Sequence, residues 1–166
     1  MIVFDASTAI LLAKIDLLEV FVSSFHGKVL ITERVKAEIC RGGSEETPLI
    51  VKMMGDGKIN VSIVRDSAAV KKLMEDFNID RGEAEALTLA LHEKTVIVAT
   101  DDRNAIRACK ILKKDFTTAI SILIRAFEKK LIDRGEAIAK LQKLGSIARY
   151  SRAIIEEAGK QIKGGT

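Results

Sequence analysis

Short apolar segments of strand length alternate with longer helical patterns along this chain. Two of the segments are continuous apolar runs, which are typical of strands buried on both faces of a parallel sheet. Strands that alternate with helices form βαβ units, so we expect an α/β/α sandwich around a mostly parallel, twisted sheet of four to five strands. The expected strands cover residues 2–5, 28–31, 59–64, 95–99 and, as a short fifth, 116–118.

Helical patterns occupy the intervals and the C-terminal part of the chain. The pattern at 83–93 is apolar on nearly every side, as expected for a helix that is buried or packed at a site. Glycines at 42–43 and at 55 and 57 indicate loops, and the tail 163–166 is expected to fray. The expected helices cover residues 9–25 with a break near Asp16, 33–41, 68–77, 83–93, 103–110, 119–131, 135–144 and 150–162.

The length of 166 residues is comfortable for one domain and short for two. No linker divides the chain, so we expect one domain over residues 1–166, with its last helices at about 119–162. Cys40 and Cys109 are far apart and outside any C-x-x-C pair, which favours free thiols in a cytoplasmic protein. We expect neither a signal peptide nor a membrane span, because no apolar run is long enough.

The charge is distributed unevenly. Residues 1–100 carry 12 Lys and Arg against 15 Asp and Glu, whereas residues 101–166 carry 15 against 8. An acidic half and a basic half are typical of a protein that binds a polyanion, with metal ions between the polyanion and the acidic part. Solvated basic helix faces without any partner explain the same counts equally well.

Acidic residues directly follow two of the predicted strands. Asp5 ends the first strand, and Asp101 and Asp102 follow the segment at 95–99. Ligands bind outside the carboxyl ends of the strands in open α/β sheets, so we expect these carboxylates at one rim. Asp5 and Asp102 could each instead serve only as the N-cap of the helix that follows. Two aspartates that only cap helices are less expected to lie at the same rim than two aspartates that belong to one site.

Two glutamates are further candidates. Glu38 follows the apolar Val35 by three residues, so its side chain can reach inward at the rim. Glu83 belongs to the sequence DRGEA at 80–84, which recurs at 133–137 and has the form of a capping box. Capping alone would therefore explain Glu83, but its apolar helix leads into the strand before Asp102, which favours a site.

A cluster of carboxylates needs cations to offset its mutual repulsion. Mg²⁺ and Mn²⁺ prefer oxygen ligands, and such ions activate water and stabilise phosphate leaving groups. The sequence contains no competing catalytic set, since His26 and His92 are isolated and there is no G-x-S-x-G, P-loop or zinc-type spacing. The carboxylates therefore predict a metal-dependent phosphoryl-transfer site.

The arrangement resembles a PIN domain, the ribonuclease fold of VapC-type toxins and related RNA-processing nucleases. The resemblance extends from about residue 2 to about residue 130, and the order and spacing of its motifs are more specific than any one of them. The form GEAEA followed by DDR is similar to an archaeal and bacterial VapC-like branch. The motifs are IVFDAS at 2–7, VKAE at 35–38, GEAEALTLAL at 82–91 and ATDDR at 99–103.

The resemblance implies a set of catalytic metal ligands, which are Asp5, Glu38, Glu83 and Asp102. The family usually has Asp at the third of these positions. Glu85 is two residues further along the helix, about 200° around it, so Glu83 and Glu85 cannot both face one ion, and we prefer Glu83. The resemblance implies auxiliary roles for Asp101, Glu85, Ser7 and Thr100.

The resemblance implies hydrolysis of RNA phosphodiester bonds by a water on Mg²⁺ or Mn²⁺, leaving a 5′-phosphate and a 3′-hydroxyl. Arg103, Arg107 and Lys110 would then bind RNA phosphates, with Lys113 and Lys114 nearby. Such proteins commonly form homodimers and, as toxins of VapBC-type pairs, are held inactive by a small antitoxin protein.

Two other functions are compatible with the sequence. One is a PIN-like RNA-binding or protein-docking module whose catalytic site has decayed, which the Glu at position 83 favours. The other is a different Mg²⁺ enzyme or a receiver domain on a similar sheet. A phosphatase of the HAD type would need Asp at position 7, where this chain has Ser, and no Lys suitable for a receiver stands out.

Overall fold

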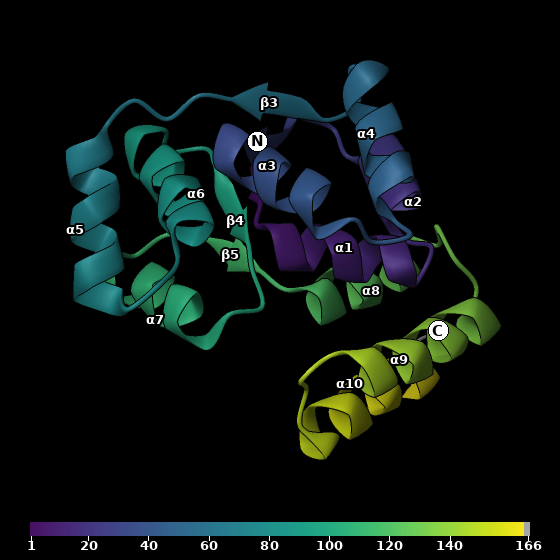
Figure 1. Ribbon diagram of the computed structural model, residues 1–166. Coiled ribbons are helices and arrows are strands. Elements are labelled where there is room, and N and C mark those ends of the chain that lie inside the picture. The colour runs from purple at the N-terminus through teal and green to yellow at the C-terminus, as the bar shows by residue number, and fades with distance from the viewer. Residues whose placement is uncertain (165–166) are drawn as a thin grey trace.

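The computed structural model describes residues 1–164 and contains one sheet of five parallel strands (Figure 1). The strand order is β3-β2-β1-β4-β5, with β1 at the centre. The predicted α/β/α sandwich is confirmed, and all five predicted strands are present. They are β1 (Ile2–Phe4), β2 (Val29–Thr32), β3 (Asn60–Ser62), β4 (Ile97–Ala99) and β5 (Phe116–Thr117).

Helices cover both faces of the sheet, and most begin and end close to the predicted positions. The predicted break near Asp16 is confirmed: residues 6–24 form two helices, and the backbone at Asp16 takes a left-handed conformation with φ of 55°. Within residues 1–164 the helices are α1 (Ala6–Lys14), α2 (Leu18–Ser24), α3 (Glu33–Gly42), α4 (Thr47–Gly55), α5 (Ser67–Phe77), α6 (Arg81–His92), α7 (Arg103–Ile111), α8 (Ala119–Glu128), α9 (Arg134–Ile147) and α10 (Arg152–Gly164).

Two details of the sequence prediction were wrong. Helix α4 was not expected, although Ile50 and Met53 are buried at a helical spacing and Pro48 stands in its first turn, where proline is well tolerated. The tail 163–166 was expected to fray, but Lys163 and Gly164 continue α10. Residues 165–166 lie outside the described residues.

The central strand β1 separates two layers of the core. Val3 packs with Leu30 and Val98 and with side chains of α5, α6 and α7 on one face. Ile2 and Phe4 point to the opposite face, where α1, α2 and α8 cover the sheet. This alternation follows from the two-residue period of a strand, and it leaves the residue after Phe4 at the carboxyl edge.

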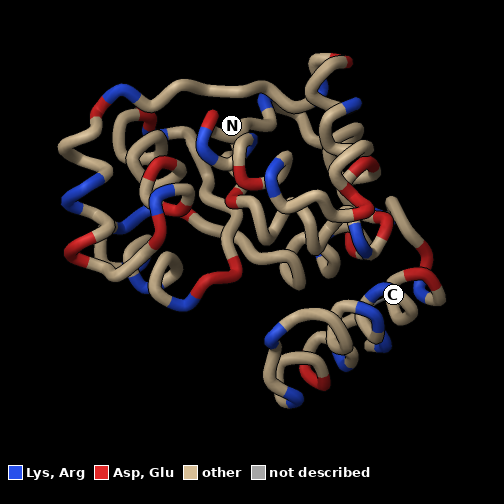
Figure 2. Tube along the Cα trace, in the orientation of Figure 1, with Lys and Arg blue, Asp and Glu red and all other residues tan. Residues whose placement is uncertain are grey.

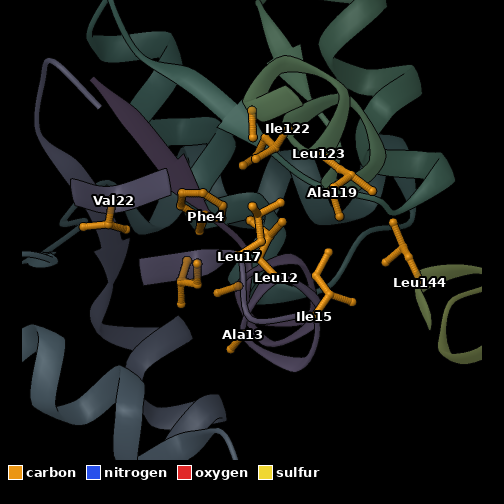
Figure 3. Close-up of a cluster of buried hydrophobic side chains, with 14 of the residues drawn as sticks. Phe4, Leu12, Ala13, Ile15, Leu17, Val22, Ala119, Ile122, Leu123 and Leu144 are labelled. Atoms are coloured by element: carbon orange, nitrogen blue, oxygen red, sulfur yellow. The ribbon is translucent and has the colours of Figure 1, made fainter. Parts of the chain in front are cut away.

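The C-terminal hairpin, defined here as α9 and α10, packs against α8 rather than against the sheet (Figure 1). Leu144 of α9 is fully buried in the same cluster as Phe4, Leu12 and Leu123 (Figure 3). The Lys140 ammonium donates to the backbone oxygen of Ile15 at 2.8 Å, at the end of α1. Residues far apart in sequence therefore hold the hairpin beside α1 and α8. None of the helices within residues 1–164 combines the length and the apolar character needed to cross a membrane.

Candidate active site at the carboxyl edge of the sheet

Asp5 directly follows β1 and is almost completely buried, with 3% of its surface exposed. One carboxylate oxygen accepts the backbone N–H of Thr8 at 2.7 Å, so Asp5 is also the N-cap of α1. The other oxygen accepts the hydroxyl of Thr100 at 2.6 Å. The backbone N–H of Thr8 and the hydroxyl of Thr100 thus hold the Asp5 carboxylate in one orientation.

The Asp5 carboxyl is costly to ionise in this position. Burial raises its pKa to about 6, the hydrogen bonds from Thr100 and Thr8 act in the opposite direction, and the negative charge of Asp101 raises the pKa further. No cation is paired with Asp5 within residues 1–164. A bound cation would offset the negative charge at this point.

Asp102 lies at the turn between β4 and α7, and hydrogen bonds through Thr100 link it to Asp5. The backbone N–H of Asp102 donates to the Thr100 hydroxyl oxygen at 3.2 Å, and that hydroxyl donates to Asp5. The Asp102 carboxylate accepts the N–H of Ala105 at 2.9 Å as the N-cap of α7. Both strand-end aspartates therefore cap a helix, as the simpler interpretation predicted, and both lie at the predicted rim.

Asp101 lines the larger cavity beside the acidic residues and is occupied by structural hydrogen bonds. Its carboxylate accepts the Thr8 hydroxyl at 2.7 Å and the backbone N–H of Ala119 at 3.2 Å. The phenol of Tyr150, from the segment between α9 and α10, donates to it as well. Asp101 thus connects α1, α8 and the C-terminal hairpin.

Glu83 opens α6 and forms the capping box expected from DRGEA. Its carboxylate accepts the backbone N–H of Asp80 at 3.0 Å, while the Asp80 carboxylate accepts the N–H of Glu83 at 2.8 Å. Partial burial raises the pKa of Glu83 to about 7, and the negative charges of Asp80, Asp102 and Asp5 contribute. These charges act on Glu83 because the three carboxylates lie near it.

Glu38 approaches from α3 and contacts the start of α6. Its carboxylate accepts a hydrogen bond from Arg34 at 3.1 Å, and its side chain is 26% exposed. Burial and the charge of Asp80 raise its pKa, whereas Arg34 lowers it. Glu33 and Lys36, on the same helix, are exposed to water.

Three of the four predicted ligands line one small cavity. This acidic pocket has a volume of about 120 Å³. Asp102 lies beside it and lines a larger neighbouring cavity that shares Ser7 and Glu83 with the pocket. The acidic pocket is lined by Asp5, Ala6, Ser7, Glu38, Asp80 and Glu83.

Asp80 is the pocket residue that sequence reasoning missed. The capping box explained Asp80 completely as an N-cap, so no further role was assigned to it. The signal that could have identified it is its position three residues before Glu83, since an N-cap and its box partner lie on the same helix end. Asp80 contributes a further negative charge to the pocket.

Glu85 lies outside the acidic pocket. It is buried, receives a hydrogen bond from Arg81 at 3.1 Å and lines a separate cavity with Val64 and Met74. Its charge still raises the pKa of Glu38. The structure therefore brings Glu83 to the pocket and leaves Glu85 on the neighbouring face of α6.

The three basic candidates lie on α7 and are exposed. Arg103 lines the larger cavity, directly after Asp102, and Arg107 and Lys110 follow along the helix. Figure 2 shows acidic residues at the turn before α7 and basic residues along α7 and the C-terminal hairpin. The acidic site thus has a basic surface beside it, which is the arrangement expected from the uneven charge distribution.

The oxygen-rich side chains suit a hard divalent ion. Among residues 1–164, no three or more His, Cys, Asp and Glu side chains are already grouped as a metal site. The donor chemistry nevertheless fits, because Asp5, Glu38 and Glu83 all present carboxylate oxygens. Burial is the main cause of their raised pKa values, and neighbouring carboxylates raise each pKa further. Glu38 and Glu83 have long, half-buried side chains that can turn toward an ion.

The thiols and histidines take no part in the pocket. Cys40 is exposed and Cys109 is buried, and both are free, as predicted. His92 lies 3.3 Å from Asp66 at the surface. The carboxylates are therefore the main groups at this edge that can bind a metal ion or transfer a proton.

Comparisons with known proteins agree with this architecture. A sequence model of a family described as a PIN domain matches residues 1–163. No curated protein matches the chain.

Proposed function

This chain belongs to the PIN-domain family, whose members are in general nucleases, and from this premise we propose that it is a metal-dependent endoribonuclease. The observation that carries the proposal is the meeting of Asp5, Glu38 and Glu83 in one acidic pocket, with Asp102 beside it. These residues come from four elements and approach within reach of one another only at the carboxyl edge of the sheet.

In the proposed site Asp5, Glu38, Glu83 and Asp102 hold one or two Mg²⁺ or Mn²⁺ ions. Such ions supply charge compensation for the scissile phosphate and a bound water of lowered pKa. Asp5 is the fixed ligand, because Thr8 and Thr100 orient its carboxylate before any ion binds. Thr100 is an orienting group, and Ser7 is an exposed hydroxyl at the mouth of the pocket.

We propose that the basic residues of α7 bind the substrate. Arg103 lines the cavity beside the pocket, and Arg107 and Lys110 are exposed further along α7. All three would contact the phosphates of an RNA strand that runs along this helix. Asp101 has a supporting role through Thr8, whose hydroxyl it accepts and whose backbone N–H holds Asp5.

The finer assignments are also proposals. We place the protein in the VapC-like branch and in the cytoplasm, as one domain that forms a homodimer and, if it is a toxin, is neutralised by a small antitoxin protein. A short DNA-binding protein encoded in the neighbouring reading frame would support the toxin assignment.

A second function is favoured by a specific observation. Arg34 already neutralises part of the charge of Glu38, and the capping box already occupies Glu83, in a pocket without a ready-made metal cluster. A PIN-like RNA-binding or docking module that no longer uses metal would have these features. Calorimetric titration with Mn²⁺ separates the two: saturable binding lost in Asp5→Asn supports the nuclease, and no binding supports the module.

Cleavage of labelled RNA with Mn²⁺, with Mg²⁺ or with a chelator tests the nuclease directly. We expect metal-dependent products with 5′-phosphate ends and a loss of at least about 100-fold in Asp5→Asn and Asp102→Asn, as is typical when a group that stabilises transition-state charge is removed. Asp115→Asn is the matched control, because Asp115 precedes β5 at the opposite edge of the sheet. Unchanged cleavage in Asp5→Asn and Asp102→Asn would refute the assignment.

A further inference from the structure

A larger cavity of about 730 Å³ adjoins the acidic pocket. The two share Ser7 and Glu83, so a molecule in the larger cavity lies next to the candidate metal ligands. Its walls come from α1, α7 and α8 and from the segment 147–151 at the turn of the C-terminal hairpin. The volume is in the range of cavities that hold small organic ligands.

Six of the sixteen residues that line this cavity are large aliphatic residues. Ile147 and Ile154 have 40% and 47% of their surfaces exposed, which is unusual for large apolar side chains that lie close together. Covering an exposed apolar wall with a flat apolar group removes apolar surface from water, and this lowers the free energy of the complex. The aliphatic side chains of the wall are Ile10, Leu11, Ile106, Ile120, Ile147 and Ile154.

Two arginines line the same cavity from opposite elements. Arg103 belongs to α7 and Arg149 to the turn of the hairpin, and both are exposed. Within residues 1–164, neither guanidinium forms an ion pair. Glu83, Asp101 and Asp102 line the same cavity, but none of these three carboxylates is within ion-pair distance of either guanidinium.

The position of Arg149 is determined by its neighbour. The Tyr150 hydroxyl donates to Asp101 and accepts the backbone N–H of Ile120 at 3.3 Å. These two bonds fix the turn of the hairpin against α8 and the β4–α7 turn. Arg149 is consequently held at the cavity although it lies 46 residues beyond Arg103 in the sequence.

We propose that this cavity binds the RNA nucleotide next to the cleaved bond, with its base on the aliphatic wall and its phosphate between Arg103 and Arg149. A nucleotide combines a flat apolar face with an anionic phosphate, and the cavity offers the complement of both. The assignment of the neighbouring bond as the cleaved one rests on the proposed nuclease function. The C-terminal hairpin is then part of the substrate site rather than only a support for α8.

Binding in the presence of a chelator tests this without any cleavage. The probe is a fluorescein-labelled single-stranded RNA of eight nucleotides, followed by anisotropy at several salt concentrations. We expect Arg149→Ala to weaken binding by at least about fivefold and to reduce the salt slope by about one, while Arg149→Lys retains most of the affinity. Ile154→Glu, which places a negative charge on the apolar wall, should weaken binding similarly.

Matched controls lie elsewhere on the surface. Arg152→Ala removes an exposed arginine that pairs with Glu156 at 2.8 Å, outside the cavity. Val51→Glu changes an apolar residue of α4 with 43% exposure, close to the 47% of Ile154. Both should bind RNA within about twofold of the wild type, and thermal melts of all variants exclude unfolding as a cause.

The outcomes separate this inference from the proposed function. Wild-type cleavage together with unchanged affinity in Arg149→Ala and Ile154→Glu overturns the substrate cavity and leaves the nuclease intact. If both variants weaken RNA binding but the wild type cleaves no RNA with either metal, the nuclease proposal is wrong and the cavity remains an RNA-binding site. No RNA binding by the wild type overturns the cavity assignment. If Ile154→Glu converts a dimer to a monomer at unchanged RNA affinity, a second copy covers the wall and the proposal is wrong.

Discussion

The carboxylate of Glu38 lies directly against Gly82, so that a methyl group at position 82 would come within 2.9 Å of both Glu38 oxygens. Gly82 is buried in the first turn of α6, one residue before Glu83. The absence of a side chain there is what allows a carboxylate from α3 to reach the start of α6. The spacing of the two glutamates in the acidic pocket therefore depends on this glycine.

Replacing Gly82 with Ala should displace the Glu38 carboxylate and preserve the fold. The contact involves the end of a flexible side chain, and Ala is favoured over Gly in a helix by about 0.5–1 kcal/mol. We expect metal-dependent cleavage to fall by at least about tenfold, with a free energy of unfolding within about 1 kcal/mol of the wild type.

Gly135→Ala is the matched control, because DRGEA recurs there and the added methyl group would meet only Asp133, at 3.3 Å. This variant should cleave RNA like the wild type. Wild-type cleavage in Gly82→Ala would show that the position of Glu38 is unimportant for activity.

The two glutamates of α6 should differ sharply in their effect on cleavage. Glu83 lines the acidic pocket, whereas Glu85 is buried beside Arg81 at a separate cavity. We expect Glu83→Gln to reduce the rate of RNA cleavage by at least about 100-fold and Glu85→Gln to change it by less than about threefold. Glu85→Gln should instead lower the melting temperature, because Arg81 loses its partner. The reverse pattern of rates would reassign the third ligand to Glu85.

The metal-free protein should lose stability as the pH rises through the pKa of Asp5. Burial raises that pKa to about 6 from an ordinary value of 3.8, so the folded state binds the proton more tightly than the unfolded chain. Stability therefore falls between about pH 4 and pH 6, and a shift of this size corresponds to ~3 kcal/mol at most. Urea unfolding with a chelator at pH 4 and pH 8 spans this range. The same measurement on Asp5→Asn separates the contribution of Asp5 from that of Glu83, whose pKa is raised to about 7.

Asp5→Asn isolates this contribution. The Asn amide can accept the N–H of Thr8 and donate to the Thr100 hydroxyl, which rotates to accept it. The variant should consequently be more stable than the wild type at pH 8, where Asp5 is ionised, and this advantage should shrink toward pH 4, where Asp5 is protonated. A difference between the two proteins that does not depend on pH would contradict the raised pKa.

Tyr150 should stabilise the C-terminal hairpin through Asp101. Burial and the Asp101 charge raise the pKa of Tyr150, so the phenol keeps its proton and donates it. Hydrogen bonds to charged groups contribute about 1.5–3 kcal/mol. We expect Tyr150→Phe to lower the free energy of unfolding by about that amount.

A double-mutant cycle with Asp101→Asn tests the pair itself. The two changes should be non-additive by about 1 kcal/mol in the free energy of unfolding, because Tyr150→Phe removes the bond and Asp101→Asn removes the charge that strengthens it. Additive effects would mean that Tyr150 stabilises the hairpin by packing alone.

Local patterns in the sequence were sufficient for most of the secondary structure. Apolar segments predicted all five strands, and cap residues such as Asp5 and Asp102 mark helix starts that the structure confirms. Helix α4 was missed because the glycines on either side of it dominated the pattern, although Ile50 and Met53 are both buried. The rim position of Asp5 and Asp102 was also predictable, since residues that follow neighbouring parallel strands must lie at the same edge.

The sequence by itself determined which carboxylates end strands and open helices, because caps and strand ends depend on residues only a few positions apart. Only the tertiary structure decided that Glu38 meets Gly82, that Asp80 joins the pocket and that Tyr150 binds Asp101. These contacts join residues 40 or more positions apart, or depend on which way a helix faces. Their geometry is set by how α3, α6 and the hairpin pack on the sheet, and the packing of whole helices is not encoded in any short segment of the chain.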